Sequence, residues 1–312
     1  MTHFQAFKLC KNFEIRGISM DTELVVGIIL IASILAGAVA LLARAPDIEF
    51  FETHSAHSFR SHQTKVPEIT LGFWFLKILT TTLGETAGDS ITMNWLKADS
   101  SVNNGYLLGS GTLLLVLLSL VAIQISAKRF HPFLFWSAIV ASTTAGTAMA
   151  DFVTRSLGTG YAGGSMILLM VLVGVLGLWL SVKGSISINT VSPPRVEVFF
   201  WTAVVVSQTS GAALADWIAD SVGLGYEGAG IVFAAGLAIT SALYYWTDIS
   251  RVLLFWVAFI LTRPLGATLG DFLDKPLNHG GLALSRPIAS LMIALILTGL
   301  IVIVPQRAAA QT

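Results

Sequence analysis

Residues 73–89 read FWFLKILTTTLGETAGD, and the chain contains this pattern four times. In each copy a Phe-Trp pair is followed by a Gly ten residues after the Trp and by an Asp five residues later. Another small residue, Gly or Ala, stands four residues after each Gly. The Trp, Gly and Asp positions are Trp74, Gly84 and Asp89; Trp136, Gly146 and Asp151; Trp201, Gly211 and Asp216; and Trp256, Gly266 and Asp271. A pattern that recurs at this many positions identifies an internal repeat.

The composition is that of a membrane protein. Of the 312 residues, 54% are hydrophobic and only 12% are charged, whereas a soluble domain has roughly 25% charged residues. The net charge is zero and no strongly basic segment is present, so nucleic acid is not an expected partner. A single cysteine, Cys10, excludes a disulfide framework and a Cys-x-x-Cys metal or redox motif. The expected partner is the lipid bilayer.

Residues 1–23 are of mixed polarity, and residues 24–43 form an uninterrupted apolar run. A run of this length is enough to cross roughly 30 Å of hydrocarbon as a helix, so we expect an extra transmembrane helix there. A signal peptide is the alternative, because Ala43-Arg44-Ala45 resembles a cleavage site. The acidic residues before the run argue against a signal, which has basic residues at that place.

The polar loop at 44–68 holds His54, His57 and His62, whose spacing makes them weak candidates for metal ligands. A solvated loop without a ligand is the alternative, because no cysteine and no helical spacing fixes these side chains.

Four repeats follow at 69–127, 128–190, 191–248 and 249–305, with a C-terminal tail at 306–312. Each repeat starts with the helix that carries the Trp, Gly and Asp and continues with a nearly uncharged helix. Two helices per repeat bring every Trp helix into the membrane from the same side, and the small residues allow these helices to approach closely. The expected fold is an all-α polytopic membrane protein of about nine transmembrane helices. Eight of them form four parallel two-helix repeats around a pseudo-four-fold axis.

Basic residues predict the orientation in the membrane. Nine of them lie on the side where the Trp helices begin, against seven on the other side. We therefore expect the Trp ends and the C-terminus on the cytoplasmic side of the inner (plasma) membrane. The Trp residues would anchor the helices at the interface, and Lys77 would reach back to the headgroups.

The first copy runs from Lys65-Val66-Pro67-Glu68-Ile69-Thr70 through Phe73-Trp74 to Gly84-Glu85-Thr86. With the repeated Phe-Trp helices, it resembles a family of bacterial integral-membrane proteins built from four tandem two-span repeats of unknown function. The resemblance covers about residues 65–305. The run at 24–43 departs from the family, whose members commonly begin close to the first repeat. The resemblance implies the architecture and leaves the function open.

Charged residues fall within the expected spans, where each costs at least roughly 2.5–3.5 kcal/mol unless it is paired or hydrated. With a rise of 1.5 Å per residue, Glu85 lies about 16 Å beyond its Trp and each repeat Asp about 22 Å. Thr82 precedes Glu85 and Asp89 at helical spacing and extends a polar stripe on one helix face. The candidate ion or substrate path is made of Glu85, Asp89, Asp151, Asp216, Asp220, Asp271, Arg263 and Thr82.

Two relationships within this path are more specific. Asp216 and Asp220 are one helical turn apart without a base at helical spacing. Their repulsion either raises the pKa of one carboxyl or invites a cation, which makes the pair a weak metal candidate. Arg263 and Glu85 both fall near mid-membrane, and neither has an opposite charge on its own helix. We expect them to neutralise each other across the bundle.

The function expected from these features is a transporter or channel-like permease for a small solute, with a metal cation or a proton-coupled substrate as the first candidate. The alternative is a membrane scaffold or sensor whose polar residues only hold helices together. Asp151 and Asp271 favour that alternative, because a base stands four residues after each. No catalytic triad, HExxH, P-loop or dinucleotide motif occurs in a usable context, so neither an enzyme nor a cofactor is expected.

Overall fold

A computed structural model describes residues 64–95, 104–191, 193–277 and 281–309. The expected span at 24–43 and the three loop histidines, His54, His57 and His62, lie outside the described residues. Apart from one isolated bridge between Pro67 and Ala308, all regular secondary structure in the described part is helical. Its long helices are α3 (Leu71–Asp89), α4 (Asn104–Ser126), α5 (Pro132–Asp151), α6 (Gly160–Lys183), α7 (Pro194–Asp216), α8 (Gly225–Trp246), α9 (Arg251–Asp274) and α10 (Arg286–Ile303).

Three of the Trp helices change from α to π geometry directly after the repeat Asp. The π segments are η2 (Ser90–Trp95), η3 (Phe152–Ser156) and η5 (Trp217–Ser221), whereas α9 stays α-helical to Asp274. A short 3₁₀ turn, η4 (Ile188–Thr190), precedes α7. π segments are rare and often lie at functional sites.

The all-α membrane fold is confirmed. Seven described helices are long and apolar enough to cross a membrane. The remaining long helix, α3, falls short because Lys77, Glu85, Asp89 and several threonines lower its hydropathy. The count of nine spans and the pseudo-four-fold symmetry stay predictions.

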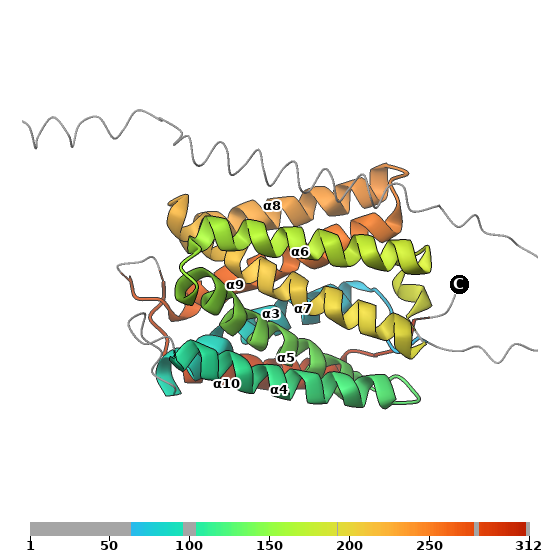
Figure 1. Ribbon diagram of the computed structural model, residues 1–312, viewed down its shortest axis with the longest axis horizontal. Helices are drawn as coiled ribbons and strands as arrows, with labels where there is room; N and C mark the ends of the chain where they lie inside the picture. Colours follow the sequence, from blue (N-terminus) through green and yellow to red (C-terminus); the bar gives the residue numbers. More distant parts are fainter. Residues whose placement is uncertain (1–63, 96–103, 192, 278–280, 310–312) are drawn as a thin grey trace, which may run out of the picture.

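The four Trp helices form a closed inner ring. Helix α3 packs against α5, α5 against α7, α7 against α9, and α9 returns to α3. The apolar second helices lie outside this ring: Figure 1 shows α6 and α8 along one edge of the bundle and α4 and α10 along the other. Each outer helix packs mainly on the inner helix of the next repeat, and α10 of the last repeat packs on α3 of the first. The repeats are therefore interlocked.

The repeated glycines make the same contact at each step of the ring. Gly84 faces Thr143 of the next repeat, and a Cβ added to it would lie 2.9 Å from the Thr143 carbonyl carbon. Gly266 faces Thr81 in the same way, also with 2.9 Å to the carbonyl carbon, and this contact closes the ring. Gly146 faces Gln208, and Gly211 faces Arg263. The contacted residue is always the seventh after its Trp, so glycine is required for the helices to approach.

The Phe-Trp pairs form a second closed ring at the end where the inner helices begin. Within each pair the rings meet edge to face, with centroids 5.2–5.5 Å apart. Between repeats, the Phe of one pair contacts the Trp of the next. These contacts are Phe73–Trp136 at 5.5 Å, Phe135–Trp201 at 5.8 Å, Phe200–Trp256 at 6.4 Å and Phe255–Trp74 at 5.8 Å.

The expectation that the Trp residues anchor the bundle in the lipid interface is wrong for three of them. Trp136, Trp201 and Trp256 are buried, and Trp74 is half-buried. Two indoles have internal hydrogen-bond acceptors: Trp136 Nε1 donates to Gln306 Oε1 at 3.2 Å, and Trp256 Nε1 to the Ile186 carbonyl at 3.1 Å. Ring closure explains the difference, because an indole that packs on the preceding repeat's Phe turns away from lipid.

Candidate functional site

Residues at equivalent positions of the four inner helices form successive layers between the ring of Phe-Trp pairs and the opposite end of the bundle. The first layer lies three residues after each Trp and consists of Lys77, Ile139, Val204 and Phe259. Lys77 is fully buried there, and its Nζ lies 4.2 Å from the centre of the Phe259 ring. No hydrogen-bond partner for this amine occurs among the described residues. The expected reach of Lys77 back to the headgroups is therefore wrong.

Arg263 lies in the next polar layer and contacts all three other inner helices. Its Nη2 lies 2.8 Å from Glu85 Oε2 on α3 and donates to Thr147 Oγ1 on α5 at 2.7 Å. Its Nε donates to the Gln208 carbonyl on α7 at 3.1 Å. Arg263 is fully buried and Glu85 nearly so. The predicted pairing of Arg263 with Glu85 across the bundle is confirmed.

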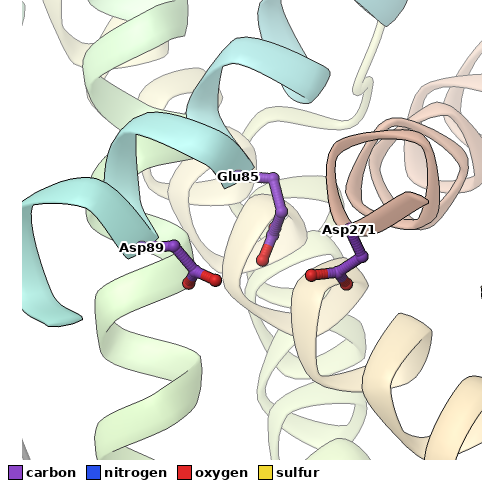
Figure 2. A group of neighbouring side chains, drawn as sticks. All are labelled: Glu85, Asp89 and Asp271. Carbon is purple, nitrogen blue, oxygen red and sulfur yellow. The ribbon is translucent and has the colours of Figure 1, made fainter. Parts of the chain in front are cut away.

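Three carboxylates from two helices gather beyond this pair. Glu85 and Asp89 of α3 and Asp271 of α9 each have an oxygen within 4.8 Å of the others, and all three are buried. Figure 2 shows their carboxylates turned toward one another. Carboxylate oxygens are the ligands that hard divalent cations prefer. This group has a geometry that can hold a metal ion.

Two basic residues from the segment after Asp271 neutralise this group in part. Lys275 Nζ lies 3.2 Å from Asp89 Oδ2 and 3.0 Å from Asp271 Oδ1. Arg286 Nε lies 3.2 Å from Asp274 Oδ2 and 3.6 Å from Asp89 Oδ2. Burial disfavours the charged form of Lys275, but the surrounding carboxylates, Asp271 first, outweigh it and hold the pKa of Lys275 well above its usual value.

The remaining repeat carboxylates differ from one another. Asp151 is buried and pairs with Arg155 at 3.0 Å, as the four-residue spacing predicts. Asp216 is half-buried, and no base among the described residues lies within ion-pair distance of it. Asp271 and Asp151 repel it electrostatically, and Arg155 attracts it from beyond ion-pair distance. Asp220 is exposed and accepts a hydrogen bond from Tyr226 at 3.3 Å. A cation at Asp216 and Asp220 stays a prediction.

Thr82 is buried, but its hydroxyl donates to the Ile78 carbonyl of its own helix at 3.0 Å. The functional partner that the sequence reasoning missed is Thr147, whose Oγ1 contacts both Arg263 and Glu85 Oε2. Its position in the repeat could have predicted this contact, because Thr147 stands eleven residues after its Trp, as Glu85 does. The contacts of Lys275 and Arg286 with Asp89 had no such signal, since they depend on how the segment after α9 folds back.

Carboxylates outnumber basic residues in the part of the inner ring that runs from the Glu85–Arg263 pair to the end opposite the Phe-Trp pairs. This part holds six carboxylates and four bases. The carboxylates are Glu85, Asp89, Asp151, Asp216, Asp271 and Asp274, and the bases are Arg155, Arg263, Lys275 and Arg286. The described part therefore carries two more carboxylates than bases here. Such a surplus at membrane depth is costly unless a proton or a cation neutralises it.

Comparison with known proteins identifies the repeats. A family model described as Repeat of Unknown Function (DUF347) matches the chain four times, at residues 72–130, 134–185, 199–250 and 254–305. No curated protein and no solved structure is similar enough to this chain to count as a match. The matches together cover more than half of the sequence and coincide with the interlocked helix pairs, so the chain belongs to the family of proteins with DUF347 repeats.

Proposed function

We propose that the protein is a membrane permease for a small cation or a proton-coupled solute, and that the axial carboxylates hold the cation or the coupling proton. The supporting observation is the surplus of carboxylates around Glu85, Asp89 and Asp271 at membrane depth. A bundle that needed only stability would place apolar residues there, because ion pairs stabilise a core poorly. Charged residues inside membrane proteins commonly mark ion pathways and proton relays.

The layers suggest a division of labour along the path. The outer carboxylates Asp89 and Asp271 would receive the cation or proton. The Glu85–Arg263 pair would form the barrier that separates them from Lys77 and the aromatic ring. Thr147 Oγ1 also accepts a hydrogen bond from the Arg263 guanidinium, so this barrier is held from α5 as well as from α3. From the bias of basic residues, we place the Trp end on the cytoplasmic side of the plasma membrane.

A non-transporting scaffold is the second candidate. Two observations favour it: Asp151 pairs with Arg155 and Asp271 with Lys275, each along its own chain segment. The pairs of Arg263 with Glu85 and of Lys275 with Asp89 cross between helices, and a scaffold uses such pairs to fix helix positions.

Flux measurements separate the two candidates. The purified chain is reconstituted in liposomes, and a panel of divalent cations is supplied outside. Proton movement is followed with a pH-sensitive dye inside and metal-ion movement with a metal-sensitive dye inside. We expect a flux in the wild type and its loss in Glu85→Gln. The matched control is Glu197→Gln, which removes another buried, paired glutamate, held by Lys65 at 2.6 Å near the Trp end of α7. The control should retain flux.

Two outcomes would contradict the proposal. Absence of flux for every ion tested, with an intact wild-type protein, would favour the scaffold. Equal flux in Glu85→Gln and in the wild type would remove the axial carboxylate from the path. Size-exclusion profiles of both variants show whether a loss of flux is a loss of folded protein.

A further inference from the structure

The carboxylate group at Glu85, Asp89 and Asp271 already contains a cation of the chain itself. Lys275 Nζ lies between two of the three carboxylates, 3.2 Å from Asp89 Oδ2 and 3.0 Å from Asp271 Oδ1. We propose that this group is a binding site for a divalent hard cation and that the Lys275 ammonium is its tethered competitor. The inference deepens the proposed function by naming the substrate class, and in that respect it rests on it.

A buried carboxylate without a hydrogen-bond donor supports this assignment independently. Asp271 is 1% exposed, and neither of its oxygens accepts a hydrogen bond from a described residue. Its contact with Lys275 is ionic and lacks hydrogen-bond geometry. Figure 2 shows the carboxylate directed at Glu85 and Asp89. A single ionic contact neutralises a carboxylate buried in this way incompletely, so a bound cation would stabilise it further.

The spacing of the oxygens allows one cation to bind all three. The three ligand oxygens lie within 4.8 Å of one another. One hard divalent cation, such as Ca²⁺ or Mn²⁺, can therefore lie within reach of all three carboxylates.

The charge balance also favours a divalent ion. Arg263 neutralises Glu85, which leaves Asp89 and Asp271 as two negative charges. The single charge of Lys275 lies between these two, and Arg286 is farther from Asp89, at 3.6 Å. A divalent cation in the place of the ammonium would neutralise both aspartates.

Lys275 is placed to leave without unfolding the site. It is the first residue after α9, and its side chain is 16% exposed, whereas that of Arg263 is fully buried. The following segment is held by backbone hydrogen bonds, Leu282 N to the Phe272 carbonyl at 2.8 Å and Leu284 N to the Leu273 carbonyl at 2.9 Å. A rotation of the Lys275 side chain therefore frees the site while this segment stays in place.

Binding of Mn²⁺ to the full chain in detergent, followed by the loss of its free electron paramagnetic resonance signal, tests the proposal. Lys275→Met should bind a single Mn²⁺ about ten-fold or more tightly than the wild type, because a tethered competitor acts at high effective concentration. Lys275→Arg, which keeps the charge, should bind no more tightly than the wild type. Asp271→Asn added to Lys275→Met should remove the gain.

A matched control uses the other base near these carboxylates. Arg286→Gln removes a positive charge beside Asp89 and Asp274 but leaves Lys275 in place. An equal gain in Arg286→Gln would show general electrostatics and overturn the proposal. Equal affinity of Lys275→Met and the wild type would also overturn it.

If Lys275→Met is unstable on extraction, Mn²⁺ in the extraction buffer should restore a monodisperse protein, and failure to do so counts against the site. The readout is independent of flux. Mn²⁺ binding without transport would contradict the permease and leave the site, whereas transport without Mn²⁺ binding would contradict the site alone.

Discussion

The four repeats make the same contacts at one end of the inner ring and different contacts at the other end. At the end where the helices begin, all four repeats make one contact: the Phe of each pair packs on the Trp of the next. At the far end each repeat Asp has a different surrounding. Asp151 pairs with Arg155 along its own chain, Asp216 has no base at ion-pair distance among described residues, and Asp89 and Asp271 share Lys275. Repetition builds the frame, and divergence within it builds the candidate site.

Packing and charge respond differently to a repeated sequence. A close contact between helices works equally well in every copy, so the glycine and aromatic contacts are kept. Identical charges around one axis would repel, because four carboxylates in a low-dielectric region cannot all ionise unpaired. The four repeat Asp residues must therefore be neutralised differently. The position seven residues after the Trp carries a base in the fourth repeat alone, where Arg263 faces Glu85 of the first.

The largest effect is expected at the ion pair between Arg263 and Glu85, which joins the fourth repeat to the first. Arg263→Gln leaves Glu85 buried without its base, and breaking such a pair costs about 3–5 kcal/mol. The midpoint of thermal unfolding in detergent should fall strongly in Arg263→Gln and in Glu85→Gln. The double variant should recover much of the loss, since no uncompensated charge remains. Strictly additive losses would mean that the two residues are not coupled.

A smaller effect is expected from the frame alone. Gly266→Ala places a methyl group against the backbone of Thr81, and overpacking of this kind costs about 1–3 kcal/mol. Gly111→Ala is the control, because Gly111 is exposed on α4 and an added Cβ meets nothing within 4 Å. The control should be neutral or stabilising by up to about 1 kcal/mol, from helix propensity. Equal unfolding temperatures for both variants would show that the ring is not closed through this contact.

The smallest effect, and one of opposite sign, is expected at Lys77, where a charged side chain replaces an apolar member of a packed layer. Lys77→Met keeps the volume and removes an amine that has no hydrogen-bond partner among described residues. Replacement of buried charges by apolar residues of similar volume is often neutral or stabilising, here by about 1 kcal/mol. Unfolding temperature checks this. A clear destabilisation would indicate that the amine has a partner, and that charge as well as packing stabilises the Trp end of the ring.

Much of the frame was predictable from spacing alone. The recurrence of Trp, Gly and Asp gave four parallel helix pairs and the inner position of the Trp helices, because local periodicity sets which face of a helix carries small residues. The depth of each residue below its Trp also predicted that Glu85 and Arg263 meet. This depends only on helix rise, which is a constant of the backbone.

The tertiary structure decided which groups become neighbours across the ring. It packs each outer helix on the following repeat, turns the Trp residues inward and buries Lys77 against Phe259. It also brings Lys275 and Arg286 to Asp89, from which they are separated by nearly the whole set of repeats. The sequence by itself determined the repeated helices and the depth of their charges, since both follow from spacing along one helix. Which charge neutralises which depends on ring closure and on the fold of the segment after α9, and no local pattern encodes either.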